Sequence, residues 1–433
     1  MRFIASQNPK AMKKVLYIML FLIFAMNLTA QSVWDGSREA ISSGSGTESD
    51  PYLIENAQQL AWLVYTINWD YSRWTSGKYF LLTTDIDLNG SPDNQWIPIG
   101  AGPSADSHKY FEGVFDGGFH SITGIYIDAD NPINNSADMW VSSYAGFFTE
   151  LGANAVVKNL YLEGSVTSGR KAGGFAGNSY GVFEYCISNV NVESTAQTAA
   201  GIVSFGNATV KFCANLGNIR GKNGAGGIVA WNGAVENCYN NGNIEAEDYV
   251  GGIAGRSMRI KNCYNVGDVV YSSNATHVGA IVGIKPSGGS IDNCYYLEGC
   301  IASTNEYGEP ETADFMRSEE FVNLLNNDIT IWAMDTENVN DGYPIFDETF
   351  MNVSEITENT DVVVVYPNPV VDNVYVVGDV VSCDVYDLVG KCVRKDAKSC
   401  VSTISVTDLP SGIYMIRFVM KNGNVVTKKI VKK

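Results

Sequence analysis

The sequence contains few of the residues that build most catalytic and metal sites. Its three histidines, His108, His120 and His277, are scattered along 433 residues. No HExxH motif occurs, which excludes the zinc-peptidase helix built on that motif. The GNSYG stretch at 177–181 is not interpreted as the nucleophile elbow of α/β-hydrolases. The sequence therefore offers no ready peptidase or esterase centre.

Proline and positive charge are also scarce. Proline accounts for 12 residues and glycine for 43, a balance that suits many tight turns between strands. Residues 31–361 hold 15 basic and 41 acidic residues. Residues 1–30 hold four basic and no acidic residues, and residues 362–433 hold ten basic and six acidic residues. The negative middle region repels nucleic acid and anionic membranes, so nucleic-acid binding is excluded.

Long apolar runs are confined to the start of the chain. Lys13 and Lys14 precede an apolar segment at Val15–Met26, and the run ends in NLTA before Gln31. This pattern predicts a secretory signal peptide at 1–30. The alternative, a membrane anchor, needs roughly 20 apolar residues, more than this segment has. No later segment is long or apolar enough, so the mature chain is expected to have no transmembrane segment.

A repeat runs through the middle of the chain. Aligned on its glycine pair, the six units begin at Tyr144, Ala172, Ala199, Ala225, Val250 and Val278. Each unit alternates apolar and polar residues over short runs and has no helix-length periodic stretch, which predicts short strands separated by turns. A unit this small buries its apolar face only by stacking on its neighbours. The sequence therefore predicts an all-β fold, a parallel β-helix whose six repeat coils occupy residues 144–300.

Cysteine occupies one position in successive units. The column consists of Cys186, Cys213, Cys238, Cys263 and Cys294, with Leu160 in the first unit. Six residues further, the units carry Val166, Val192, Ile219, Ile244, Val269 and Cys300. Positions that exchange cysteine with aliphatic residues point inward, where a free thiol packs as a small apolar group. Disulfides and a metal site are the alternatives, but stacked side chains lie about 4.8 Å apart and a line of thiols offers no tetrahedron.

Asparagine and glycine repeat in the same units. Two residues after the cysteine, three units carry an asparagine: Asn215, Asn240 and Asn265. This spacing predicts a ladder of stacked amides, and the glycine pairs fit a corner that has no room for a Cβ atom. The GFAG of Gly174–Gly177 and the GIAG of Gly252–Gly255 resemble the GLUG motif, a short repeat of exported bacterial surface proteins. That resemblance implies a repeat architecture and no particular activity.

Residues 31–143 are expected to form an N-terminal cap and the first coils. Apolar residues at helical spacing predict one α-helix through Ala57, Leu60, Leu63, Val64 and Ile67. The segments KYFLLTTDIDL and FEGVFDGGFHSITGIYI then predict strands. This leader resembles the segment ahead of such repeats in Bacteroidetes proteins. A cap of this kind covers the exposed end of a solenoid core.

Residues 301–361 are expected to form a C-terminal cap and a linker. The amphipathic stretch ETADFMRSEEFVNLLNN predicts helix, with four apolar residues available to face inward: Phe315, Phe321, Leu324 and Leu325. The GYPIF of Gly342–Phe346 is expected to complete this second cap. Capping helices are thus predicted at both ends of the β-helix.

Residues 362–433 differ from the rest in composition. Alternating strands broken by turn dipeptides predict a small antiparallel β-sandwich. The YPNP of Tyr366–Pro369, the GIYMIRF of Gly412–Phe418 and the lysine-rich end resemble the type IX secretion C-terminal sorting domain. This resemblance implies type IX secretion machinery as a partner and export across the outer membrane to the cell surface. Of its three cysteines, Cys383, Cys392 and Cys400, at least one is free or bonds elsewhere.

An exported β-helix raises the hypothesis of a pectinase-like polysaccharide lyase or glycoside hydrolase. Such enzymes use carboxylates on one face with supporting basic residues. The RIK triplet at Arg259–Lys261 resembles one of their motifs, but no GHG motif accompanies it, and we expect it to flank an inward Ile260. No residue is assigned a catalytic role. Two or three carboxylates within about 10 Å beside a basic residue would favour an enzyme, and acids spread over all faces an adhesin.

The segment DIDLNGSPD at 85–93 begins like a calcium-binding loop. Its candidate metal ligands are Asp85, Asp87, Asn89 and Asp93. The bidentate glutamate of such a loop is missing, because Trp96 stands at the twelfth position. Ile86 and Leu88 also suit inward strand positions. Calcium is thus a candidate ligand, and no other cofactor is expected.

Aromatic residues gather ahead of the repeats, where six of the eight tryptophans lie. The segment NWDYSRW at 68–74 brings Trp69, Tyr71 and Trp74 into one loop. Exposed rings with polar neighbours can stack on sugar rings, so these three residues are candidate ligand-binding residues. The alternative is that the rings fill the cap against the first coil.

The sequence as a whole favours an exported, surface-attached β-helix without catalysis. Adhesion, or binding of glycans and of host or neighbouring surface proteins, is the leading hypothesis, argued from architecture and cellular address. A polysaccharide lyase or hydrolase is the second hypothesis. A structural component of a surface layer is the third.

Overall fold

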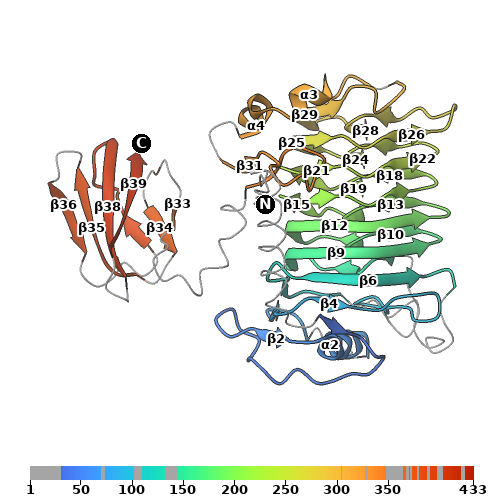
Figure 1. Ribbon diagram of the computed structural model, residues 1–433, viewed down its shortest axis with the longest axis horizontal. Helices are drawn as coiled ribbons and strands as arrows, with labels where there is room; N and C mark the ends of the chain where they lie inside the picture. The colour runs from blue at the N-terminus through green and yellow to red at the C-terminus, as the bar shows by residue number, and fades with distance from the viewer. Residues whose placement is uncertain are drawn as a thin grey trace, which may run out of the picture. The chain divides into compact units, whose positions relative to one another are not determined.

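The structure is a computed structural model, and Figure 1 gives the element labels used below. It describes residues 31–69, 74–101, 110–131, 144–303, 305–326, 330–347, 364–366, 370, 373–377, 380–387, 391–396, 403–420 and 425–433. The predicted signal peptide at 1–30 and Tyr71 lie outside the described residues. The chain divides into two compact units, Met1–Phe346 and Asp347–Lys433, and each has its own buried core.

The first unit is a parallel β-helix, which confirms the predicted fold class (Figure 1). Its longest sheet, counted over the described residues, has 18 strands: β1 Ser32–Val33, β2 Tyr52–Ile54, β3 Tyr79–Leu82, β4 Ile86–Asp87, β5 Val114–Asp116, β6 Ser121–Asp128, β9 Val156–Ser168, β12 Val182–Ser194, β15 Thr209–Lys211, β16 Ala214–Asn215, β17 Ile219–Arg220, β20 Ala234–Glu236, β21 Tyr239–Asn240, β22 Ile244–Ala246, β25 Arg259–Asn265, β26 Val269–Tyr271, β29 Ser290–Leu297 and β30 Glu309–Glu311. Because successive coils place their strands side by side, the inward residues form one continuous core.

Two shorter sheets close the six coils from Tyr144 onward. The first contains β7 Tyr144–Ala145, β10 Lys171–Gly173, β13 Thr198–Ala200, β18 Gly224–Gly226, β23 Val250–Gly251 and β27 Val278–Gly279. The second contains β8 Phe148–Leu151, β11 Ala176–Ser179, β14 Val203–Phe205, β19 Val229–Trp231, β24 Ala254–Arg256 and β28 Val282–Ile284. The glycine-containing corner of the repeat lies between these two sheets, as the sequence predicted.

The register of the coils follows the sequence repeat with one exception. Ala172 pairs with Ala199, and the following units continue in step. In the first unit, however, Ala145 and not Tyr144 pairs with Ala172, so the predicted start is wrong by one residue. The inward position takes the small, fully buried Ala145, and the half-buried Tyr144 ring stays outside beside Lys171.

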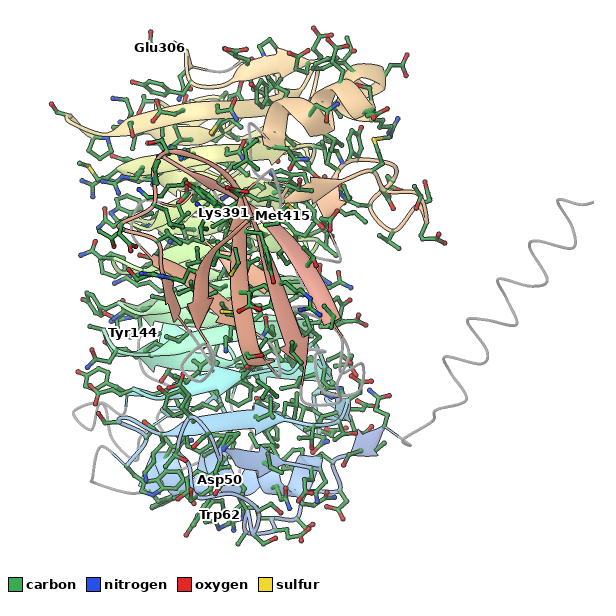
Figure 2. The ribbon with its side chains drawn as sticks, turned by 90° about the vertical axis from the view of Figure 1, so that its left-hand side faces the viewer. Asp50, Trp62, Tyr144, Glu306, Lys391 and Met415 are labelled. Atoms are coloured by element: carbon green, nitrogen blue, oxygen red, sulfur yellow. The ribbon has the colours of Figure 1, made fainter. Side chains whose placement is uncertain are left out.

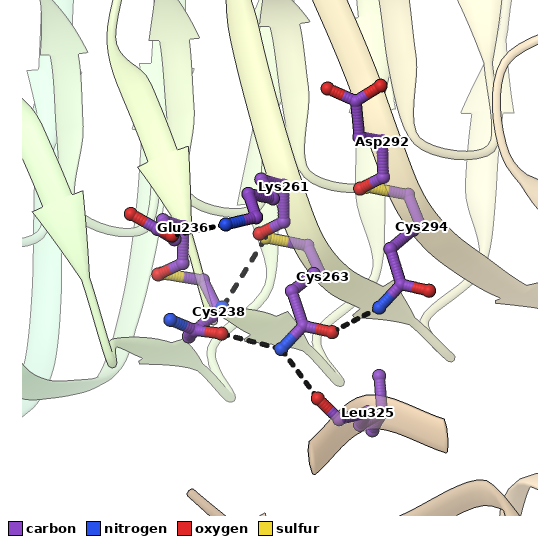
Figure 3. Close-up of polar contacts among 10 residues, drawn as sticks. Glu236, Cys238, Lys261, Cys263, Asp292, Cys294 and Leu325 are labelled. Atoms are coloured by element: carbon purple, nitrogen blue, oxygen red, sulfur yellow. Dashed lines mark hydrogen bonds and ion pairs between the residues drawn. The ribbon is translucent and has the colours of Figure 1, made fainter. Parts of the chain in front are cut away.

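The cysteine column lies inside the β-helix. Leu160 pairs with Cys186, and Cys263 pairs with Cys294, and the described cysteines of this column are buried free thiols. The Cys238 thiol donates to the carbonyl oxygen of Glu236 at 3.2 Å and forms no disulfide bond (Figure 3). The Cys263 and Cys294 thiols make the same contact with the carbonyl oxygens two residues before them. Burial raises the pKa of the Cys238 thiol well above its ordinary value. These thiols therefore pack as apolar groups.

The asparagines form the expected ladder. The Asn215 amide donates to Asn240 Oδ1 and the Asn240 amide donates to Asn265 Oδ1, each at 2.7 Å, and all three side chains are fully buried. Each amide also donates to the carbonyl oxygen two residues further along the chain. A Cβ atom at Gly227 would lie 2.5 Å from the Asn240 side chain, so the glycine leaves room for the ladder.

The N-terminal end is covered by α2 at Ala57–Trp69. The five residues predicted to face inward, Ala57, Leu60, Leu63, Val64 and Ile67, are all buried. Asn56 caps the helix by accepting a hydrogen bond from the backbone N–H of Gln59 at 2.8 Å. In Figure 2, Asp50 and Trp62 lie at this end of the solenoid, whereas Glu306 lies at the other.

The C-terminal cap consists of α3 Ala313–Met316, α4 Glu319–Asn326 and an antiparallel pair, β31 Trp332–Ala333 with β32 Ile345–Phe346. It covers a row of tyrosines on the side of the last coils: Tyr239, Tyr264 and Tyr295. The prediction that Leu324 faces inward is wrong, because its side chain is 39% exposed. The helix buries the predicted Phe321 and Leu325 together with Val322, and Leu324 lies beyond the edge of that apolar stripe.

The second unit is built from two antiparallel sheets. One contains β33 Val364–Tyr366, β34 Asn373–Val377 and β37 Thr403–Ser405; the other contains β36 Cys392–Asp396, β35 Val380–Asp387, β38 Gly412–Met420 and β39 Val425–Lys432. Residues from both sheets share one core, which confirms the predicted small β-sandwich. Cys383 is disulfide-bonded, and Cys392 is an exposed free thiol, so one of the three cysteines is indeed free.

Candidate ligand-binding surface

The aromatic residues predicted to bind ligand do not form one described cluster. Trp69 ends α2, is 40% exposed, and has its ring centroid 6.0 Å from that of Tyr65. The Trp74 ring packs inside the cap, with centroids 5.8 Å from Tyr52 and 6.1 Å from Trp62. Tyr71 lies outside the described residues. For Trp74 the structure therefore shows the cap-filling arrangement, and sugar stacking by Trp69 stays a prediction.

The predicted calcium loop is held by contacts within the protein. Asp85 accepts hydrogen bonds from the Ser121 backbone N–H at 2.7 Å and from the Ser121 hydroxyl at 3.0 Å. Asp87 accepts from the Asn89 backbone N–H at 2.8 Å, and Asp93 is exposed. Among the described residues, no group of three or more His, Cys, Asp or Glu side chains is arranged to hold a metal ion. Calcium binding at Asp85, Asp87, Asn89 and Asp93 stays a prediction.

The two sequence stretches that resemble catalytic motifs have structural roles. Arg259 and Lys261 are exposed on either side of the fully buried Ile260, as expected. Lys261 Nζ lies 3.2 Å from Glu236 Oε1 on the neighbouring coil (Figure 3). Ser179 of the GNSYG stretch is fully buried in β11, and its hydroxyl accepts a hydrogen bond from the Gly181 backbone N–H. A strand and not a helix follows it, so no nucleophile elbow forms.

A groove with charged walls lies along one corner of the β-helix. It begins where β12, β17, β22 and β26 end, has a volume of about 410 Å³, and crosses four successive coils. It is lined by residues 193–195, 220–222, 245–247 and 270–272, and we call it the charged groove. Stacked coils place equivalent residues about 4.8 Å apart, so the charged groove is about 14 Å long.

Three successive coils alternate in charge at one position of the charged groove. Glu193 pairs in register with Arg220, and Arg220 pairs with Glu245. Arg220 Nη1 lies 3.7 Å from Glu193 Oε1, and Arg220 Nε lies 3.6 Å from Glu245 Oε1. These side chains are 63%, 46% and 53% exposed for Arg220, Glu193 and Glu245, respectively. Such exposed pairs contribute little to stability and remain open to other charged partners.

Glu193, Arg220 and Glu245 form the kind of cluster that would favour an enzyme, two carboxylates within about 10 Å beside a basic residue. Glu193 and Glu245 lie two coil spacings apart, roughly 10 Å, with the basic residue Arg220 between them. Sequence reasoning missed this site. A signal was present, because Glu193, Arg220 and Glu245 each follow directly after a residue of the inward aliphatic column.

A second polar cluster lies at the neighbouring turn. Asp248 accepts hydrogen bonds from the backbone N–H groups of Thr276 at 2.9 Å and His277 at 2.8 Å, and its Oδ2 lies 3.1 Å from His277 Nδ1. Desolvation raises the pKa of Asp248, but these hydrogen bonds outweigh it and lower the pKa to about 2. The His277 ring stacks on Tyr249 at 4.1 Å. This cluster fixes the turn that follows the charged groove.

Residues 364–433 match the family model described as the secretion system C-terminal sorting domain. This segment is a type IX sorting domain. It directs the protein by type IX secretion to the cell surface or the extracellular space, as the sequence predicted. No helix among the described residues has the length and apolar character needed to cross a membrane.

Two curated proteins resemble part of the chain. A "Putative Gly-rich membrane protein" of Evansella cellulosilytica is 32% identical over 195 residues, which cover 42% of this chain and 19% of the relative. "Halomucin" of Haloquadratum walsbyi is 31% identical over 147 residues, which cover 33% of this chain and 1% of the relative. The chain therefore spans only a small part of the length of these relatives. The resemblance of the repeats to the GLUG motif stays a prediction.

One solved structure supports the fold. A Bacteroides ovatus protein, named a "putative immunoglobulin A1 protease", superposes with a TM-score of 0.53 at 25% sequence identity. The match covers 70% of this chain and 94% of that chain. The protein is thus a type IX-secreted surface protein with a β-helix fold.

Proposed function

We propose that the protein binds glycans at the cell surface without catalysis, and that the charged groove is the binding site. The observation that carries this proposal is the groove itself, an open channel of about 410 Å³ along four coils. Glutamate, arginine, lysine, serine and threonine side chains line most of it, and these groups hydrogen-bond sugar hydroxyls. Type IX secretion supports the proposal because it brings the groove into contact with glycans outside the cell.

The rigidity of the scaffold also supports binding. The asparagine ladder and the continuous core fix the strands that carry the groove walls. A preorganised surface loses little conformational freedom when an extended ligand binds. Adhesion to host or neighbouring cells would follow from many such contacts on one surface.

Polysaccharide hydrolysis is the second candidate function, and one observation favours it. Glu193 and Glu245 flank Arg220 at a separation of roughly 10 Å, close to the spacing that inverting glycosidases use. We rank it below binding because a general acid needs a carboxyl group in a desolvated site. Both carboxylates here are about half exposed, and both are in contact with the same guanidinium.

A glycan array probed with the purified chain lacking residues 1–30 tests the proposal. We expect one class of glycans to bind, and the variant Arg220→Gln to lose that binding while it keeps the wild-type unfolding temperature. An array on which no glycan binds above background would refute the proposal. Release of reducing ends from a bound polysaccharide, lost in both Glu193→Gln and Glu245→Gln, would instead establish the hydrolase.

A further inference from the structure

The charges of the groove are ordered by coil. The coil that contains β17 contributes Arg220 and Lys222 to the lining. The next coil, which contains β22, contributes Glu245 and Glu247 in the equivalent positions. Lys222 and Glu247 lie in the turns that follow β17 and β22, and the Glu247 backbone N–H donates to the Lys222 carbonyl oxygen at 2.9 Å, so the two turns lie side by side. A doubly positive level thus lies one coil spacing, about 4.8 Å, from a doubly negative level.

These charges are available to a ligand. The contacts of Arg220 with Glu193 and Glu245, at 3.7 and 3.6 Å, are longer than ordinary charge-assisted hydrogen bonds, and the side chains are exposed. Lys222 and Glu247 are exposed, and within the described part of the chain neither side chain makes an ion pair or hydrogen bond. A ligand that supplied both signs of charge at the coil spacing could satisfy all these groups together.

We propose that the charged groove selects a zwitterionic linear glycan. An acidic sugar group binds at Arg220 and Lys222, and an amino group about one coil spacing away binds at Glu245 and Glu247. The ring of Tyr271, which lines the groove on the following coil, contacts the same chain. This inference names the ligand class of the site described above and therefore rests on the proposed function.

The groove fits a glycan better than a peptide or a lipid headgroup. Peptides that bind along strands pair with a free sheet edge or anchor apolar side chains in pockets. Here the central strands β17 and β22 are already paired on both sides, and among the residues that line the groove only Val270 and Tyr271 offer large apolar groups. A single zwitterionic headgroup would span one coil spacing, whereas the groove crosses four coils. A repeating chain uses the whole length.

Three matched oligosaccharides test the proposal by titration calorimetry. The first alternates glucuronic acid with glucosamine that has free amino groups, the second is its N-acetylated form, and the third is a glucosamine oligomer of equal length. We expect the purified chain lacking residues 1–30 to bind the first at least tenfold more tightly than either single-charge compound. Equal or tighter binding of a single-charge compound would overturn the proposal. So would binding to phosphocholine vesicles with no glycan bound.

Matched variants locate the effect in the groove. Arg220→Gln and Glu245→Gln are each expected to weaken binding of the zwitterionic compound at least fivefold. The control variants are Glu236→Gln and Lys261→Gln, which break an exposed ion pair of the same type on the coil of Glu245 and the next. They are expected to change the affinity less than twofold, and equal unfolding temperatures show that all variants fold. Losses of equal size in the controls would overturn the proposal.

The two proposals fail in different ways. If the array shows neutral glycans bound, and Arg220→Gln weakens that binding, the zwitterionic ligand is wrong and glycan binding at the charged groove stands. If no glycan of any charge binds, both are wrong.

Discussion

Asn240 lies in the middle of the asparagine ladder, and its replacement by alanine tests how the coils are held together. The Asn240 amide donates to Gly242 O and to Asn265 Oδ1, and its Oδ1 accepts from the Asn215 amide, all at 2.7 Å. The side chain is fully buried, so water cannot replace these partners. Asn240→Ala leaves two buried oxygen atoms, Gly242 O and Asn265 Oδ1, without their donor.

The size of the effect follows from these lost contacts. Each buried polar group left without a partner costs about 1–3 kcal/mol, and Asn215 keeps its bond to Gly217 O at 2.8 Å. We therefore expect Asn240→Ala to lower the free energy of unfolding of the β-helix by about 3 kcal/mol. Asn243→Ala is the matched control, because Asn243 is exposed and, among the described residues, its side chain accepts only from the Asp268 backbone N–H. The control should cost below about 1 kcal/mol.

Urea unfolding followed by tryptophan fluorescence measures both variants. All eight tryptophans lie before residue 347, so the signal reports the β-helix unit and not the sorting domain. The expected result is a clear fall in the unfolding midpoint for Asn240→Ala and almost none for the control. Equal midpoints for the two variants would refute the ladder as a stabilising element.

Three further predictions address the ladder, the turn beside the groove, and secretion. Ser188 pairs in register with Asn215, and both Ser188 Oγ and Asn215 Oδ1 are buried without a hydrogen-bond partner among the described residues, so Ser188→Asn should extend the ladder and raise the free energy of unfolding by about 1 kcal/mol; a lower urea midpoint would contradict this. Asp248 has its pKa lowered to about 2 from 3.8, so its hydrogen bonds stabilise the fold above pH 4 and are lost as the pH falls through 2. Asp248→Asn should therefore cost about 1–2 kcal/mol at pH 7, allowing for the 31% exposure of the carboxylate, and little near pH 2; a cost that does not depend on pH would refute the assignment. Deletion of residues 364–433 should abolish surface display, as measured by labelling of intact cells, and unchanged labelling would contradict the role of the sorting domain.

The coil register could be predicted from the sequence because inward positions accept a narrow set of residues. Cysteine and aliphatic residues recur at a fixed place in each unit, and the structure pairs those places from coil to coil. The glycine alignment starts the first unit one residue early, because it does not show whether the Tyr144 side chain points into the coil or out of it. Its large ring lies outside the coil, and only the neighbouring Ala145 fits the inward site.

The candidate site could not be predicted because it depends on outward residues. The alternation of Glu193, Arg220 and Glu245 can be read from the aligned units, but only the stacked coils show that these residues line one groove. The position at which the C-terminal cap packs on the coils could not be predicted either, because it also depends on outward residues. Tyr264 follows the inward Cys263 in sequence, and its burial comes from a segment about sixty to eighty residues further along the chain.

Thiols from successive coils of the β-helix line one shared, dry interior. Mass-spectrometric mapping of maleimide labelling on the native protein tests this arrangement most directly. We predict rapid labelling of the exposed Cys392, whereas Cys213, Cys238 and Cys263 should react only after unfolding, because they are fully buried and their pKa values are raised. Rapid labelling of these three cysteines in the folded protein would contradict the stacked-coil account.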